Sequence, residues 1–556
     1  MFRKETLKEI ERLNKEYEAN VKRVLKKFSI EEKEAKTLSG LPLKSIYTPL
    51  DIRDNNYVED ISYPGLYPFT RGITPTGYRT KEWTIRQVVG LGTAEETNER
   101  LKYLFKQGQT GFSVCGMGYQ HYESSDERSF GILGKGGVWI DTLADIETLF
   151  DGIDMSKISI NQIGFSMPVF AMILAEAVRQ GVDFKSLSGT IQNCVFPFGE
   201  GPQMRGNGSV DISEYCTKNL PRWNHSSISV RNIRDEGISA PQEIAFGVYM
   251  GSFTLQSVVA RNIDVDEIAP RISFFLSSEN DFLEEVAKFR AMRRLWARTL
   301  KEKFNAKDPR SWLMRFHTQT TSVNLTAQQP LNNIIRSTIH ALAAVLGGAQ
   351  SMSVNSFDEV FATPTTASAT LSLRTQQIIA HESGVANVID PLGGSYCIES
   401  LTNQLEQKAI EILKELEDMQ PQKAYKYIAD QGKESGYLRQ KAIDNNERTM
   451  VGVNRFVSRE GEEGIDLGNM DILGYDPKWR DKQIKRLNRV KKERNRGKAE
   501  KARKLLEDAY RNKINIIEPM VEAVKAYLSI GEIVKIREKV YGQADLSHVW
   551  GCYFGM

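Results

Sequence analysis

Strand-like runs alternate with amphipathic helical runs from about residue 84 to residue 383, and this alternation constrains the fold more than any other feature. Runs such as TIRQVVG, KISINQIG and RISFFLSS are typical of strands, and segments such as DFLEEVAKFRAMRRLWARTLKEKF between them have helical periodicity. About eight strand–helix units in ~300 residues are what a (β/α)8 barrel requires. A doubly wound sheet needs fewer strands and a glycine-rich phosphate-binding fingerprint, so we predict an α/β fold of the TIM-barrel type.

Segments of different composition flank the predicted barrel, which we assign to residues 41–400. Residues 1–40 are predicted to form a helical arm, either solvated or clasping a partner subunit. Residues 401–556 are helical and very charged, and we predict a C-terminal helical extension or linker. The apolar residues of the arm recur at helical spacing: Leu7, Ile10, Leu13, Tyr17, Val21 and Val24.

The composition argues against nucleic-acid and membrane partners. Lys and Arg total 74 against 71 Asp and Glu, so the net charge is only +3. The most basic stretch, KQIKRLNRVKKERNRGKAEKARK, has no aromatic residues that could stack on bases, which favours a solvated helix or linker. No run approaches the ~20 apolar residues of a membrane span, and the charged N-terminus does not resemble a signal peptide. The five cysteines form no Cys-x-x-Cys pair, so we expect a cytoplasmic protein without a zinc site or disulfides.

Small polar residues lie on one face of six predicted strands, which is unusual for a barrel core. Val, Ile and Leu fill an ordinary barrel interior. Because strand side chains alternate faces with a period of two, each polar pair shares one face. Buried polar groups need partners, and bonds to helices explain one or two such strands but not six. We therefore predict that the barrel axis holds a polar, extended ligand. The polar sets are Ser159 and Asn161, Thr190 and Gln192, Ser227 and Ser229, Arg271 and Ser273, His317 and Gln319, and Ser351, Ser353 and Asn355.

Several longer runs, spread from about residue 40 to residue 550, match one family in the same order. They are YPFTRG at 67–72, WTIRQ at 83–87, GTIQN at 189–193, APRISFF at 269–275, LTAQQPLNN at 325–333, DPLGGSY at 390–396 and GVNRF at 452–456. In these runs the chain resembles the methylmalonyl-CoA mutase family. The resemblance implies a barrel threaded by the pantetheine of coenzyme A, in agreement with the polar axis predicted above.

The resemblance also implies an isomerase that works by a radical route with adenosylcobalamin. In the family, the adenosyl radical takes a hydrogen from the acyl group, the carbon skeleton rearranges and the hydrogen is returned. The cofactor carries the hard chemistry, while the protein positions the substrate and shields the radicals from solvent.

Matching motif positions assign roles to individual residues. Arg86 and Arg271 are expected to pair with phosphate or polar acyl-CoA groups, for which guanidinium geometry is well suited. The resemblance implies substrate and CoA binding by Thr84, Arg86, Ser113, Cys115, Ser159, Thr190, Gln192, Arg271 and Ser273. It places Val88, Gln192 and Asn232 at the reacting group, and His317, Gln319, Gln350 and Glu359 at the cofactor.

A motif of cobalamin-binding family members is missing. Their Asp-x-His-x-x-Gly motif supplies the lower ligand of cobalt, but none of the six histidines here has Asp two positions before it. We therefore expect no cobalamin-binding domain and no protein ligand to a metal. A separate small subunit of flavodoxin-like fold is expected to carry the motif and share the cofactor. The enzyme would then be active only as a heterodimer or heterotetramer.

Three positions depart from the pattern of methylmalonyl-CoA mutases. A family tyrosine is replaced by Val88, a carboxylate-gripping arginine by Pro202 (with Arg205 nearby but out of register), and a histidine that bonds the thioester carbonyl by Asn232. Because a desolvated carboxylate without a partner is costly, we predict a non-malonyl acyl group, branched or bulkier. Two alternatives stay open: methylmalonyl-CoA mutase proper, and a non-catalytic scaffold subunit. Beyond Cys115, the residues Met117, Tyr119 and His121 are also expected at the acyl pocket.

Overall fold

The structure is a computed structural model. It describes residues 2–29, 31, 34–116, 122–164, 166–194, 202–458 and 472–542, with the side chains of residues 202–207 left out. The predicted pocket residues Met117, Tyr119 and His121 lie outside the described residues, as do the side chains of Pro202 and Arg205.

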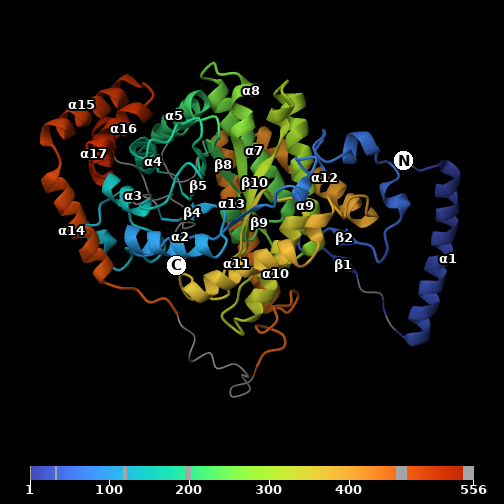
Figure 1. The fold of residues 1–556 in the computed structure, drawn as a ribbon. Helices are drawn as coiled ribbons and strands as arrows, with labels where there is room; N and C mark the ends of the chain where they lie inside the picture. Colours follow the sequence, from blue (N-terminus) through green and yellow to red (C-terminus); the bar gives the residue numbers. More distant parts are fainter. Residues whose placement is uncertain are drawn as a thin grey trace.

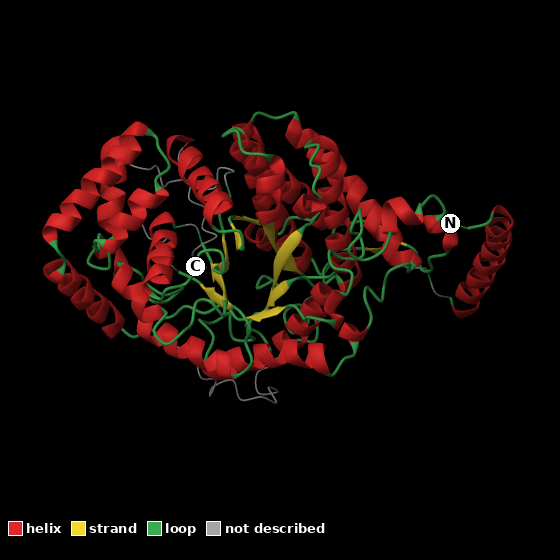
Figure 2. Cartoon of the chain, turned by 45° about the horizontal axis from the view of Figure 1, so that its top comes forward, coloured by secondary structure: helices red, strands yellow, loops and turns green. Residues whose placement is uncertain are grey.

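Parallel strands form the centre of the molecule, surrounded by helices (Figure 2). Two sheets have the orders β4-β5-β6-β7 and β3-β11-β10-β9-β8. Only His225 separates β7 from β8. After β3, Val89 pairs in parallel with Val114 of β4. The pairings therefore follow the cyclic order of the predicted TIM-type barrel. The strands are β3 (Thr84–Arg86), β4 (Phe112–Val114), β5 (Ser159–Gln162), β6 (Ser188–Ile191), β7 (Trp223–Asn224), β8 (Ser226–Ser229), β9 (Ile272–Ser278), β10 (Arg315–Thr320) and β11 (Ser351–Ser353).

The helices between the strands begin at the residues that their sequences favour. Before α7, the Ser239 side chain accepts a hydrogen bond from the backbone N–H of Gln242, and Pro241 occupies the first turn. Before α4, Ser166 caps the N–H of Val169 in the same way. The helices are α2 (Ala94–Lys106), α3 (Leu143–Leu149), α4 (Met167–Arg179), α5 (Pro202–Asn219), α6 (Arg231–Glu236), α7 (Ala240–Val259), α8 (Val265–Ile268), α9 (Phe282–Arg298), α10 (Asn332–Leu346) and α11 (Thr366–His381).

The flanking segments lie on opposite sides of the barrel (Figure 1). The N-terminal helix α1 and the short antiparallel pair β1–β2 lie on one side, and α14 to α17 lie on the other. Between them, α12 packs against α7 and α9. The elements are α1 (Lys4–Phe28), β1 (Ala35–Lys36), β2 (Pro42–Leu43), α12 (Tyr396–Glu417), α13 (Pro421–Asp444), α14 (Lys478–Glu493), α15 (Arg496–Asn512), α16 (Ile517–Lys525) and α17 (Ile530–Tyr541).

The basic stretch at residues 482–504 is helical, but only one side of it is solvated. Within α14, Trp479, Gln483 and Leu487 are buried. Arg486 is buried as well, and its Nη1 lies 2.8 Å from the Asp145 carboxylate at the start of α3. The sequence shows the charge of this helix, but it does not show which of its cations face acidic partners on the barrel.

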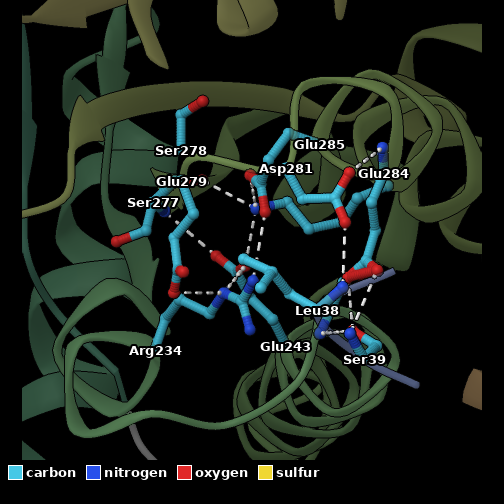
Figure 3. A network of polar contacts seen from close by, with 12 residues as sticks. Leu38, Ser39, Arg234, Glu243, Ser277, Ser278, Glu279, Asp281, Glu284 and Glu285 are labelled. Atoms are coloured by element: carbon cyan, nitrogen blue, oxygen red, sulfur yellow. Dashed lines mark hydrogen bonds and ion pairs between the residues drawn. The ribbon is translucent and has the colours of Figure 1, made fainter. Parts of the chain in front are cut away.

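A buried network of ion pairs fixes the helices around the carboxyl end of β9 (Figure 3). The Arg234 guanidinium of α6 lies 3.4 Å from the carboxylate of Glu279 and 3.1 Å from that of Glu285. Nearby cations, first among them Arg234, hold the pKa of the buried Glu279 carboxyl at about 2. Buried charges persist only when they are paired in this way. The network therefore fixes the position of α6, which begins at Arg231 and Asn232.

Candidate functional site

A polar cavity of about 160 Å3 lies along the barrel axis, and most of the predicted polar strand residues line it. As predicted from the alternation of strand side chains, residues on one face of each strand converge there, from β3, β5, β6, β7, β8, β9, β10 and β11. Its lining residues are Thr84, Arg86, Ser159, Asn161, Thr190, Gln192, Asn224, Ser227, Ser273, Phe275, Arg315, Phe316, His317, Gln350 and Ser351.

Some polar groups on the cavity wall bond one another, and others have no partner. Asn161 donates to the Ser113 hydroxyl at 3.1 Å, which places Ser113 behind the wall, and Asn224 donates to the Thr190 hydroxyl at 3.1 Å. Among the described residues, the buried Asn224 Oδ1 and His317 Nε2 find no hydrogen-bond partner. Burial lowers the pKa of His317 to about 3, so its ring is neutral. Orphaned buried polar atoms are rare in native proteins, and a ligand in the cavity would satisfy them.

Gln192 has one end of its amide anchored, and the other end makes no hydrogen bond within the described part of the chain. Its Oε1 accepts a hydrogen bond from the backbone N–H of Gly164 at 3.0 Å. This bond leaves the amide NH2 group at the cavity wall, where it can donate to a carbonyl.

Four arginines gather at the amino end of the barrel, where the cavity begins. Arg315 lines the cavity, and Arg271 lies close enough to lower its pKa. Burial, with Arg222 and Arg310 nearby, lowers the pKa of Arg271 in turn. Arg310 is paired with Asp308 at 2.5 Å, so Arg222, Arg271 and Arg315 are the cations here that suit an anionic group such as a phosphate. Arg271 was predicted from its motif, but Arg222 lies far in sequence from Arg310 and Arg315, and these three were missed.

Arg86 bonds neighbouring strands in the wall of the axial cavity. Its Nη1 donates to the backbone carbonyls of Phe112 at 2.6 Å and Ser159 at 3.0 Å, and its Nη2 donates to the Ser159 hydroxyl at 3.0 Å. These bonds use the guanidinium to tie β3 to β4 and β5. Burial lowers the pKa of Arg86 to about 10, and the side chain remains cationic near neutral pH. Arg86 also lines the axial cavity, and its expected pairing with a phosphate or a polar acyl-CoA group stays a prediction.

Gln350 lines the axial cavity. It precedes β11 and therefore sits at the amino end of that strand, where it accepts from the Phe316 N–H at 2.8 Å and donates to the Gly348 carbonyl at 2.6 Å. Gln319 and Glu359 lie at the opposite end, around a second cavity. Gln350 and His317 line the axial cavity, and the expected role of these four residues at the cofactor stays a prediction.

The second cavity, of about 710 Å3, lies at the carboxyl ends of the strands. This is the end at which TIM barrels place their active sites. Val88, Cys115, Gln319 and Glu359 line it, as do Ser353 and Asn355, each with a buried side-chain atom that lacks a partner among the described residues. Ile472, Leu473, Gly474, Tyr475 and Trp479, which precede and begin α14, form the remaining side.

Burial favours the uncharged forms of the Cys115 thiol and the Glu359 carboxyl at the larger cavity. Burial raises the pKa of the Cys115 thiol to about 11, and its Sγ donates a hydrogen bond to the Gly136 carbonyl at 3.6 Å. Burial raises the pKa of the Glu359 carboxyl to about 7, although the nearby Arg231 lowers it. Asn232, next to Arg231 at the start of α6, does not line either cavity as the described residues define them; its Oδ1 lies 3.4 Å from Arg231 Nη1.

The Glu359 carboxyl makes stability depend on pH in a defined direction. Its pKa is higher in the folded protein than the ordinary value of 4.5, so folding favours the protonated form. Stability is lost as the pH rises from about 4.5 through 7. We expect Glu359→Gln to stabilise the protein by about 2 kcal/mol at pH 8 and by little at pH 5, measured by urea unfolding. The exposed Glu382→Gln is the control, and an equal effect of both variants at pH 8 would contradict this expectation.

Comparison with known proteins identifies the family. The family model described as methylmalonyl-CoA mutase matches residues 36–543. The chain belongs to the methylmalonyl-CoA mutase family. It is 41% identical to the 2-hydroxyisobutanoyl-CoA mutase large subunit of Aquincola tertiaricarbonis, over 97% of this chain and 96% of that protein. It is 37% identical to the methylmalonyl-CoA mutases of Homo sapiens (96% of this chain, 72% of that protein) and Cereibacter sphaeroides (93% and 74%).

Family membership agrees with the geometry of the barrel. Mutases of this family depend on cobalamin and act on CoA thioesters. Such an enzyme needs one site for a long polar ligand and another for a large cofactor. None of the described helices has the length and apolar character needed to cross a bilayer.

Proposed function

We propose that the protein is the large subunit of a cytoplasmic, adenosylcobalamin-dependent acyl-CoA mutase that rearranges a non-malonyl acyl group. One observation carries the proposal: a polar cavity along the barrel axis lies between an arginine cluster at the amino end and a larger cavity at the carboxyl end. This arrangement fits an acyl-CoA whose phosphates, pantetheine and acyl group follow one another along the axis.

Each part of the axis has a role in binding the thioester. Arg271 and Arg315 hold the phosphates by charge-assisted hydrogen bonds. Ser227, Ser273 and Thr190 are small enough to admit pantetheine and can bond its amides. Gln192, through its free NH2 group, donates to a carbonyl of the ligand. Asn232 is the further candidate donor to the thioester carbonyl, provided that α6 presents its amide NH2 to the ligand.

The larger cavity suits the cofactor. Gln319 and Glu359 line it, and the unpartnered Ser353 Oγ and Asn355 Nδ2 offer hydrogen bonds to a polar group such as the adenosyl ribose. When bound there, held by Gln319 and Glu359, the adenosyl group would supply the radical chemistry. The protein holds the acyl carbon against it and keeps water away. We propose that a separate small subunit binds the rest of the cofactor, because the similar protein of Aquincola tertiaricarbonis is itself a large subunit.

The larger cavity has uncharged side chains on the side of β3 and β4, and the lysine that lines it, Lys135, lies over the Tyr475 ring. Val88 and the neutral thiol of Cys115 line the larger cavity on the side of β3 and β4. Neither can pair with a carboxylate, and a carboxylate desolvated there without a partner would be costly. The acyl group is therefore a branched or bulkier group without a free carboxylate. The name of the Aquincola tertiaricarbonis relative, 2-hydroxyisobutanoyl-CoA mutase, describes a substrate of that kind for that protein.

A competition experiment tests the substrate proposal. The two subunits, reconstituted with adenosylcobalamin, receive equimolar methylmalonyl-CoA and neutral branched acyl-CoAs, and isomers are separated by liquid chromatography and mass spectrometry. We expect kcat/KM for the best neutral substrate to exceed that for methylmalonyl-CoA by at least about 100-fold, because an unpaired desolvated charge costs several kcal/mol. A preference for methylmalonyl-CoA would establish a methylmalonyl-CoA mutase instead. A scaffold subunit would bind acyl-CoA or the small subunit without forming any isomer.

A further inference from the structure

Arg231 places a cation close to both cavities. Only Val230 separates it from β8, at the end of the barrel where such folds carry their active sites. Its guanidinium carbon lies 5.8 Å from the centre of the Phe275 ring, and Phe275 lines the axial cavity. Burial raises the pKa values of Glu359 and Cys115, which line the larger cavity, and the nearby charge of Arg231 lowers both. Arg231 therefore lies near the point where the axial cavity meets the larger one.

An aspartate one helical turn later neutralises this cation. Arg231 Nη2 lies 3.0 Å from the Asp235 carboxylate, and each of the two side chains is 15% exposed. The hydroxyl groups of Ser277 and Thr321 donate to the same carboxylate at 3.1 and 2.7 Å, which fixes its position. The pair has no net charge, but it offers N–H donors and carboxylate acceptors side by side.

The supports of this pair are fixed, and part of its hydrogen-bonding capacity is unused. The Arg234 guanidinium, on the same helix α6, lies 3.1 Å from the Glu285 carboxylate and 3.4 Å from that of Glu279 (Figure 3). Within the described part of the chain, the buried Nε of Arg231 has no hydrogen-bond partner. Such orphaned atoms are rare in native proteins. A polar pair that its neighbours hold in place can bind a ligand with little loss of conformational freedom.

We infer that the Arg231–Asp235 pair binds a hydroxyl group on the acyl chain and thereby determines acyl specificity. The guanidinium donates to the hydroxyl oxygen, and the carboxylate accepts a hydrogen bond from the O–H. A free carboxylate on the acyl group would be repelled by Asp235, and a plain alkyl group would leave the pair without a ligand bond. Val88 and Cys115 leave the side of β3 and β4 to the carbon branches. The inference rests on the proposed function for the path of the thioester, and it narrows the substrate to a branched hydroxyacyl-CoA.

Two thioesters that differ in the hydroxyl group alone test this inference. They are 2-hydroxyisobutanoyl-CoA and pivaloyl-CoA, in which a methyl group replaces the hydroxyl. Isothermal titration calorimetry on the full-length large subunit gives both dissociation constants without turnover. We expect the wild type to bind the hydroxyacyl-CoA at least about tenfold more tightly, because a site built to bond a hydroxyl rejects an analogue that lacks it. Arg231→Met offers no donor and should reduce this advantage to less than about threefold, whereas Arg231→Lys should retain part of it.

Controls separate recognition of the hydroxyl from a general effect of the changes. Arg511→Met breaks an exposed ion pair of the same spacing, with Glu507 on α15, and should leave both constants unchanged. If Arg231→Met does not fold, the double variant with Asp235→Asn removes both charges and should give the same loss. Equal binding of the two thioesters by the wild type, or an advantage that Arg231→Met leaves intact, would overturn the inference. A preference for the hydroxyacyl-CoA without any isomer from the reconstituted enzyme would contradict the proposed function alone.

Removal of the neutralising carboxylate gives an independent test. Asp235→Asn keeps an acceptor for the hydroxyl groups of Ser277 and Thr321 but leaves Arg231 without its counter-charge. We expect this variant to bind methylmalonyl-CoA at least about tenfold more tightly than the wild type does, because the free carboxylate of the ligand then pairs with the guanidinium. The same calorimetry provides the measurement. No gain in affinity in the folded variant would show that Arg231 does not reach the acyl group, and it would overturn the inference.

Discussion

Replacement of Ser273 by tryptophan is expected to lower the affinity for acyl-CoA by at least about 100-fold. Ser273 is buried on β9 and lines the axial cavity of about 160 Å3. An indole at this position would occupy the space through which pantetheine has to pass. The dissociation constant for acyl-CoA, measured by isothermal titration calorimetry, provides the test.

Matched variants distinguish a loss of affinity caused by a blocked cavity from one caused by misfolding. Ser273→Ala removes only a long hydrogen bond, of 3.4 Å to the Ser226 carbonyl, and is expected to change the affinity by less than about tenfold. Thr190→Trp blocks the axis from β6 and should reproduce the loss if Ser273→Trp proves unstable. Wild-type affinity in a folded Ser273→Trp variant would show that the ligand does not pass along the axis.

Replacement of Gln192 by methionine is expected to lower kcat/KM by about 100-fold, the effect of removing one well-placed donor to a reacting carbonyl. Methionine keeps the length of the side chain but offers no N–H. The Gly164 N–H loses its acceptor as well, so part of the loss can come from the loop that follows β5. The kinetic constants of the reconstituted enzyme measure the total effect.

Two further variants test whether the amide NH2 group of Gln192 acts as a hydrogen-bond donor. Gln192→Glu retains an acceptor for the Gly164 N–H but loses the amide donor, and its activity should remain low. Gln404→Met on α12, far from the axis in sequence and fold, should behave like the wild type. Full activity of Gln192→Glu would contradict a donor role for this amide and leave Gln192 with a positioning role.

The polar axis could be predicted from the sequence because the signal is local. Ser159 and Asn161, or Thr190 and Gln192, are two residues apart, and the pleat of a strand is enough to place both on one face. The larger cavity was predicted only in part. Gln319 lies near the carboxyl end of β10, and Val88, Cys115 and Glu359 follow strands by short intervals, whereas Trp479 comes from a helix more than a hundred residues later.

Other features of the site could not be predicted from the sequence, for physical reasons. Arg86 has the charge to bind phosphate, but its nearest acceptors are backbone carbonyls that no sequence pattern shows. Gln350 was grouped with Gln319, yet β11 begins only at Ser351, and a residue before a strand lies at the opposite end from one inside it. The arginines at the amino end become a cluster only when β7, β9 and β10 are side by side in the barrel.

The central claim is that acyl-CoA bound along the axis is isomerised with the help of cobalamin, and the most direct test is isotope transfer. The reconstituted enzyme receives adenosylcobalamin labelled with tritium at the 5′ carbon and a neutral branched acyl-CoA. We predict that tritium appears in both the remaining substrate and its isomer, and that Ser273→Trp abolishes the transfer. Isomer formation without transfer of label, or no isomer from any acyl-CoA, would contradict the account.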